Sequence, residues 1–116
     1  MSRPLGLVLP LLFLAITVLV PEPAAGKDGE CLGAQKGLRW RVGIVPQLPP
    51  REIVSTWTPV LKEVGRRTGQ CLVLVIAPSI PAFEQQLRAG TLDFAFLNPY
   101  HQVMAQRWRG FIPLVR

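Results

Sequence analysis

Residues 71–81 read CLVLVIAPSIP, a continuous apolar run that stops at a proline-containing turn. Uninterrupted runs rich in β-branched side chains are typical of strands that are buried on both faces of a parallel sheet. Pro78 cannot continue the strand, and Pro81 suits the first turn of a helix. Gly90 then stands where a helix of this length ends. The stretch therefore predicts a strand followed directly by a helix, the repeating unit of an α/β fold.

The same unit recurs on both sides of this stretch. Residues 38–45 (LRWRVGIV) predict a strand that ends in prolines, and apolar residues at spacings of four, four and three predict a helix over residues 52–67. Downstream, residues 92–97 (LDFAFL) predict a third strand, residues 99–108 a helix and residues 111–115 a fourth strand. The order β-α-β-α-β-α-β predicts an α/β fold, a parallel sheet with flanking helices and right-handed crossovers.

The N-terminus differs in composition from the rest of the chain. It contains Arg3, then the apolar run LGLVLPLLFLAITVLV at 5–20, and small residues before Lys27. We interpret residues 1–26 as a secretory signal peptide, because such a run forms a helix of only about 24 Å against a bilayer core of roughly 30 Å. An uncleaved membrane anchor is the alternative. The polar, glycine-rich residues 27–37 (KDGECLGAQKG) predict a flexible lead-in.

The charge balance is basic, with 13 Lys and Arg against 7 Asp and Glu and a net charge of +6. Arg3 and Glu22 cancel, so the whole excess belongs to residues 27–116. The cations are scattered in runs no longer than two, which predicts a solvated basic surface. Nucleic-acid binding would need a basic stripe or a groove-reading helix, so we expect no nucleic acid as partner.

Motifs for catalysis and for metals are missing from the sequence. It has no G-x-S-x-G nucleophile elbow, no G-x-x-x-x-G-K phosphate loop and no paired carboxylates at a strand end. We therefore expect no enzyme, no catalytic residue and no cofactor. Cys31 and Cys71 with a single histidine do not make a metal site, but after an export signal they are free to form a disulfide.

Polar side chains follow the first three predicted strands. Gln47 follows the first, Ser79 the second, and Asn98 and Tyr100 the third. Ligands of open parallel sheets bind beyond the carboxyl ends of the strands, and the helix N-termini there attract anions. These four residues are our candidate ligand-binding residues.

Two of these candidates also have a purely structural explanation. Asn98 with Pro99 fits helix capping, and Tyr100 fits a packed surface aromatic. His101, the only histidine, is expected as an exposed helix residue.

The motifs RVGIVPQ at 41–47, W-x-P-V-L at 57–61 and AGTLDFAFLNPY at 89–100 resemble a known family. They are similar to the phosphate/phosphite/phosphonate-binding periplasmic proteins of ABC transporters, over residues 38–116. The resemblance implies a type II periplasmic-binding fold, in which two lobes clamp a small oxyanion. It implies that residues 38–116 are an incomplete first lobe of a truncated receptor, which works with an ABC permease in the inner membrane and catalyses no reaction.

The resemblance also implies roles for single residues. Gln47, Ser79, Asn98 and Tyr100 would line the first-lobe side of the cleft, and Asp93 would be structural. In this fold the first two strands start side by side, so we hypothesise a Cys31–Cys71 disulfide that ties the lead-in to the sheet. The alternative function is an extracytoplasmic ligand-sensing module of a membrane-anchored signalling kinase. Such a protein would keep residues 5–20 as a membrane anchor, and its sensing module would face the periplasm.

Overall fold

The computed structural model describes Ser2 and residues 29–115, so the predicted signal peptide lies outside the described residues apart from Ser2. The elements follow one another as strand β1, strand β2, helix α1, strand β3, helix α2, strand β4 and helix α3. Their bounds are β1 Cys31–Gly33, β2 Arg39–Ile44, α1 Pro50–Thr68, β3 Cys71–Ile76, α2 Ile80–Ala89, β4 Phe94–Phe96 and α3 Pro99–Arg109.

The four strands form one sheet in the order β1-β3-β2-β4. Strand β2 lies in the centre and pairs in parallel with both β3 and β4, whereas β1 pairs antiparallel with β3. The predicted α/β fold class is therefore confirmed, with a sheet that is mostly parallel. The alternation of strands and helices from β2 to α3 is also as predicted.

Two predictions about the ends of this region differ from the structure. The predicted fourth strand at 111–115 is wrong, because these residues have no strand pairing. Conversely, β1 lies inside the predicted flexible lead-in 27–37, where Cys31–Gly33 pair with the start of β3. Both differences have one cause: a strand exists only where a neighbouring strand accepts its hydrogen bonds, and short-range composition does not report that neighbour.

The helix ends agree more closely with the sequence. Gly69, Gly90 and Gly110 cap the three helices with left-handed φ angles of 69°, 68° and 70°, as their positions after each apolar pattern indicate. Helix α1 begins at Pro50, slightly before the predicted start, and runs through Pro59 without ending there.

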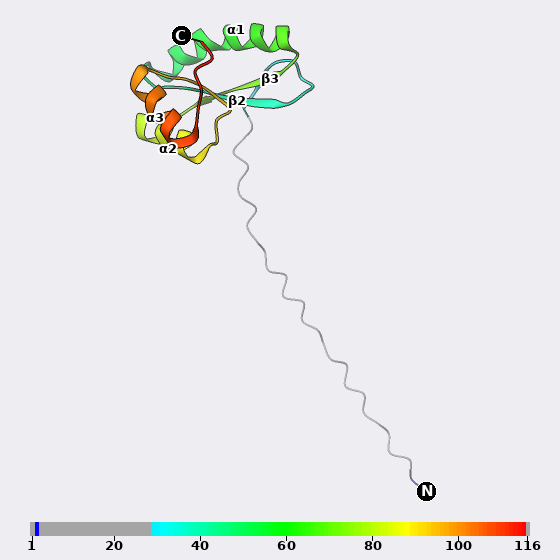
Figure 1. Ribbon diagram of the computed structural model, residues 1–116. Helices are drawn as coiled ribbons and strands as arrows, with labels where there is room; N and C mark the ends of the chain where they lie inside the picture. Colours follow the sequence, from blue (N-terminus) through cyan, green and yellow to red (C-terminus); the bar gives the residue numbers. More distant parts are fainter. Residues whose placement is uncertain (1, 3–28, 116) are drawn as a thin grey trace.

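Helix α1 lies on one face of the sheet, and α2 and α3 cover the other (Figure 1). Each face has its own hydrophobic core. The core between α1 and the sheet is formed by the buried residues Leu32, Val42, Ile44, Ile53, Leu61 and Leu72. The core between the sheet and helices α2 and α3 is formed by the buried residues Val45, Ala77, Phe83, Leu87, Leu92 and Ala105. This division accounts for the continuous apolar run of β3, since a strand between two helical layers is covered on both faces.

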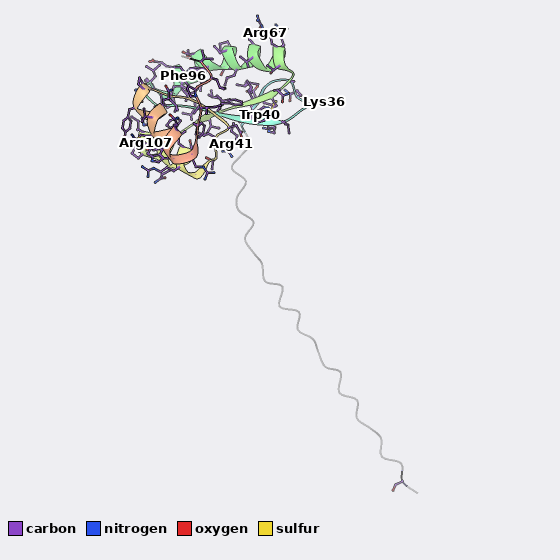
Figure 2. The ribbon with its side chains drawn as sticks, in the orientation of Figure 1. Lys36, Trp40, Arg41, Arg67, Phe96 and Arg107 are labelled. Carbon is purple, nitrogen blue, oxygen red and sulfur yellow. A yellow bond between two sulfur atoms is a disulfide. The ribbon has the colours of Figure 1, made fainter. Side chains whose placement is uncertain are left out.

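The surface carries its charges on separate elements. Lys36 precedes β2, Arg41 lies in β2, Arg67 in α1 and Arg107 in α3, and their side chains are spread over the molecule (Figure 2). The cationic side chains labelled there come from four different segments, which agrees with the scattered pattern of the sequence.

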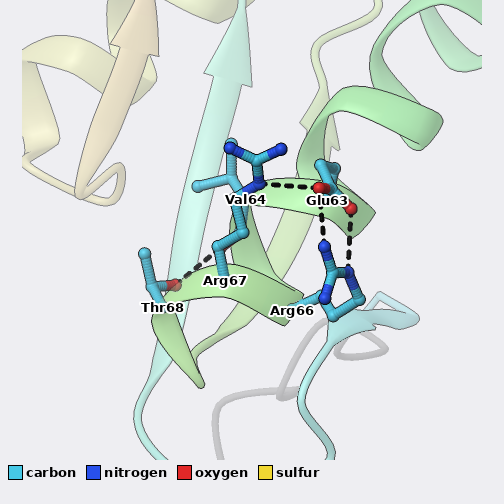
Figure 3. Close-up of polar contacts among 5 residues, drawn as sticks. All are labelled: Glu63, Val64, Arg66, Arg67 and Thr68. Carbon is cyan, nitrogen blue, oxygen red and sulfur yellow. Dashed lines mark hydrogen bonds and ion pairs between the residues drawn. The ribbon is translucent and has the colours of Figure 1, made fainter.

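An ion-pair cluster lies in the last turns of α1 (Figure 3). Glu63 accepts hydrogen bonds from Arg66 at 2.8 and 2.9 Å and from Arg67 at 2.6 Å. These two guanidinium groups lower the pKa of Glu63 from 4.5 to about 2. Thr68 Oγ1 donates to the Val64 carbonyl at 2.7 Å in the same turn.

Candidate ligand-binding edge of the sheet

The register of the parallel strands brings three predicted site residues to one edge. Ile44 pairs with Ile76 on one side and with Phe96 on the other. Gln47 and Ser79 follow that row by three residues, and Asn98 follows it by two. An added hydrogen bond from Val45 N to Phe96 O, at 3.1 Å, extends the β2–β4 pairing toward this edge. All three residues therefore lie in the loops at the carboxyl ends of the strands.

Two of these residues cap helices. The Ser79 hydroxyl accepts a hydrogen bond from the Ala82 N–H at 3.2 Å at the start of α2. Asn98 Oδ1 accepts from the His101 N–H at 2.9 Å at the start of α3. Both predicted N-termini are thus formed by side-chain caps, which satisfy one of the free N–H groups there. The remaining free N–H groups of each first turn form the positive end of the helix dipole, which lies at this edge of the sheet.

The candidates differ in exposure. Gln47 and Ser79 are exposed and Asn98 is half-buried, and the Gln47 backbone N–H donates to the Val45 carbonyl at 2.8 Å. Tyr100 lies in the first turn of α3 with 60% of its surface exposed. Its ring stands edge-on to that of His101, with centroids 5.1 Å apart. The Tyr100 hydroxyl is therefore not enclosed by the protein core.

The prediction that His101 is an exposed helix residue is wrong. Its side chain is buried, with 3% of the residue surface exposed. Nδ1 lies 2.9 Å from Asn98 Oδ1, and Nε2 lies 3.1 Å from Glu84 Oε1 on α2. One feature of the sequence points to this position, a histidine three residues after a predicted cap. The partner Glu84 belongs to another helix, so no local pattern connects it with His101.

Asp93 has the structural position that the family resemblance implies. Its carboxylate accepts a hydrogen bond from the Arg41 N–H at 2.7 Å, and its own N–H donates to the Arg41 carbonyl at 2.9 Å. These bonds fix the start of β4 against β2. They lie at the amino end of the strand, away from the edge that carries Gln47, Ser79 and Asn98.

A groove of about 1040 Å³ lies at a different place, along the outer edge of β4. Its walls include Trp57 of α1, the whole of β4 and residues 110–115. None of the four candidate residues lines it, although Pro99 and Gln102 of α3 do. The groove is mainly apolar, with Phe96 52% exposed, and its polar lining residues include Asp93, Gln102 and Arg109.

Cys31 and Cys71 are joined as a disulfide in the structure, with Cα atoms 5.3 Å apart. Strand β1 carries the first cysteine alongside the start of β3, where the second one stands. This Cα distance lies in the range that a disulfide spans. The bridge would hold β1, the outermost strand on this side, to the sheet.

Two further properties concern the residues 29–115 that the structure describes. Within that range no group of three or more His, Cys, Asp or Glu side chains is placed to hold a metal ion. No helix there is long and apolar enough to cross a membrane.

The family model described as ABC transporter, phosphonate, periplasmic substrate-binding protein matches residues 42–116, more than half of the chain. A search of the curated proteins found no match. The matched region contains the last three residues of β2, strands β3 and β4, the three helices and all four candidate residues. The chain therefore belongs to this family of periplasmic phosphonate-binding proteins of ABC transporters, which bind their ligands and are not catalytic.

Proposed function

We propose that the protein captures a small phosphorus oxyanion, a phosphonate, phosphite or phosphate, at the carboxyl edge of β2, β3 and β4. It then delivers the ligand to an ABC permease in the inner membrane. The observation that carries this proposal is the shared register of Ile44, Ile76 and Phe96. It supports a single site for the side chains that follow these strands, in a family whose ligand class is the phosphonates.

The chemistry of the four candidates suits an anion. Gln47 and Asn98 each have an amide NH₂ group, and Ser79 and Tyr100 each have a hydroxyl that can donate. None of them is a carboxylate, which would repel the ligand. Hydrogen bonds from neutral donors to a charged oxygen are stronger than those between neutral groups, and the first turns of α2 and α3 add their dipoles. The site would therefore hold the anion without a buried cation.

The variant Asn98→Asp tests this site directly. Aspartate keeps the oxygen that caps α3 but replaces the amide donor by a negative charge. We expect methylphosphonate, phosphite and phosphate each to bind at least tenfold more weakly to the variant than to the wild type. The four side chains would contact the ligand from one side only, so we expect weak binding. Affinity is therefore measured by an NMR titration of backbone amides, which detects millimolar dissociation constants.

Arg107→Gln is the matched control for that titration, because Arg107 is an exposed residue of the same helix α3 and is not a candidate. Its affinity should equal that of the wild type. If Asn98→Asp binds all three anions as well as the wild type does, the edge of the sheet is not the ligand site.

We further propose that the protein is exported and cleaved after Gly26. N-terminal sequencing of the protein from the cell should then begin at Lys27. A sequence that begins near Met1 would instead support the alternative of an anchored sensing module.

A further inference from the structure

We propose that His101 is a positioning residue, held by Glu84, that sets the orientation of the Asn98 amide so that its NH₂ group faces the ligand edge. This role rests on the proposed function, because it concerns the donor that Asn98 would give to the anion. The three side chains form a chain of hydrogen bonds, from Glu84 on α2 through the buried ring of His101 to Asn98 at the start of α3.

The Asn98 atom that faces the helix is identified by the group opposite it. The His101 backbone N–H lies 2.9 Å from the Asn98 side chain and can only donate. The atom opposite it must therefore be the oxygen Oδ1, which accepts. This assignment does not depend on the state of the imidazole.

The hydrogen-bond partner of Nδ1 sets which ring nitrogen of His101 carries a proton. Nδ1 faces the same Oδ1 at 2.9 Å. Since Oδ1 is an acceptor, Nδ1 carries a proton and donates. Rotating the Asn98 amide by half a turn would place its NH₂ group against two donors, the backbone N–H and Nδ1–H. The ring thus adds a second bond that holds the amide in one orientation, beyond the ordinary cap.

Side chains from both helices hold the His101 ring in place. Nε2 lies 3.1 Å from Glu84 Oε1, and the Glu84 side chain is 26% exposed. A single proton between Nε2 and Oε1 makes one hydrogen bond, which satisfies both atoms. The rings of Phe83 and Tyr100 stand edge-on to the imidazole, with centroids at 6.0 and 5.1 Å. With contacts from α2 and α3, the ring has one orientation available, and Nδ1 faces Asn98.

The consequence appears at the opposite side of the Asn98 amide. Its Nδ2 has no hydrogen-bond partner among the described side chains, and it is not among their buried unpaired atoms. The NH₂ group is thus open to solvent at the edge that Gln47 and Ser79 share. An oriented donor binds an anion more tightly than a rotating one, because no rotational freedom is lost on binding. His101 would therefore raise ligand affinity without touching the ligand.

The ring state is tested by NMR of the ¹⁵N-labelled wild type without ligand. The sequence contains one histidine, so its ring signals need no assignment by mutation. We expect Nδ1 to show the chemical shift of a protonated nitrogen at neutral pH. An Nδ1 without a proton would overturn the inference, whatever the protein binds.

The coupling to Asn98 is tested by a double-mutant cycle with methylphosphonate. His101→Phe keeps an aromatic ring beside Phe83 but removes Nδ1–H, and we expect it to weaken binding by three- to tenfold. In the background of Asn98→Ala, the same change should have no further effect on affinity. A merely structural role would lower affinity equally in both backgrounds, and that result would overturn the inference.

Glu84 provides a second route that leaves the histidine in place. Glu84→Leu should weaken methylphosphonate binding, because Nε2 loses its partner, and Glu84→Gln should restore most of it, because the amide can hydrogen-bond Nε2. Equal affinities of these two variants would overturn the role of Glu84. If neither the wild type nor any variant binds phosphonate, phosphite or phosphate, the proposed function fails, and the positioning role fails with it even if Nδ1 is protonated.

Discussion

Gly33 at the end of β1 and Gly65 in α1 lie directly against each other. A Cβ atom added to Gly33 would come within 2.5 Å of the Gly65 Cα, and one added to Gly65 would lie 2.5 Å from the Leu32 carbonyl oxygen. The Gly33 φ angle of 100° is also in the region that glycine favours. The strand thus passes under the helix at a distance that no side chain permits.

Gly65→Ala should therefore destabilise the protein. In an exposed helix this change is favourable by about 1 kcal/mol, because alanine has the higher helix propensity. Here the added methyl group meets backbone atoms of Leu32, Gly33 and Gln70, which cannot move as a flexible side chain would. We expect a loss of about 1–3 kcal/mol in the free energy of unfolding, measured by urea denaturation.

Lys62→Ala is the control for this substitution, since Lys62 is an exposed residue of the same helix. Its free energy of unfolding should stay within about 0.5 kcal/mol of the wild type. A Gly65→Ala variant as stable as the wild type would mean that β1 does not lie this close to α1.

The disulfide between Cys31 and Cys71 should contribute to stability through the loop that it closes, with a sequence separation of 40. A loop of that size predicts about 2–4 kcal/mol. Thermal unfolding of the protein with oxidised cysteines should show a lower midpoint after addition of reductant. The double variant Cys31→Ser/Cys71→Ser should unfold at that lower midpoint with or without reductant. Two titratable thiols in protein taken from the periplasm would contradict the pairing.

Glu63 gives a pH dependence with a definite sign. Its pKa is lowered from 4.5 to about 2 by Arg66 and Arg67, so its ionised form is favoured in the folded state. The stabilisation is fully present above pH 4.5 and is lost as the pH falls toward 2. Because the ion pairs are exposed, the effect should be small and weakened by salt.

NMR titration of the Glu63 carboxyl carbon measures this pKa directly. We expect a midpoint near pH 2 at low ionic strength and a higher one in about 1 M salt, where charges are screened within about 3 Å. Arg66→Gln and Arg67→Gln should each raise the midpoint. A midpoint near 4.5 at low salt would show that the cluster does not persist in solution.

Ser79 allows capping and ligand binding to be separated. Ser79→Ala removes the acceptor for the Ala82 N–H and should cost about 1 kcal/mol in the free energy of unfolding. Ser79→Asp keeps an acceptor and suits the helix dipole, so its stability should match the wild type. The added negative charge at the sheet edge should nevertheless weaken methylphosphonate binding. Wild-type affinity in Ser79→Asp would place the anion away from α2.

Much of this protein could be predicted from local patterns. The apolar run of β3, the prolines that follow β2 and β3, and the glycines at 69, 90 and 110 report the conformation of their own neighbourhood. They placed the three helices and the three parallel strands, and Asn98 as the start of a helix. These signals work because capping, turn formation and burial on both faces depend on residues close in the chain.

Other features were decided only by contacts between distant residues. β1 is a strand because β3 accepts its hydrogen bonds, and residues 111–115 form none because no strand lies beside them in the described structure. The burial of His101 between Glu84 and Asn98 needs α2 and α3 to pack together. The sequence by itself determined the three helices, the three parallel strands and the predicted positions of polar side chains after those strands. The tertiary structure determined which side chains are paired at the carboxyl edge of those strands, because hydrogen bonds between elements depend on how the helices and strands pack.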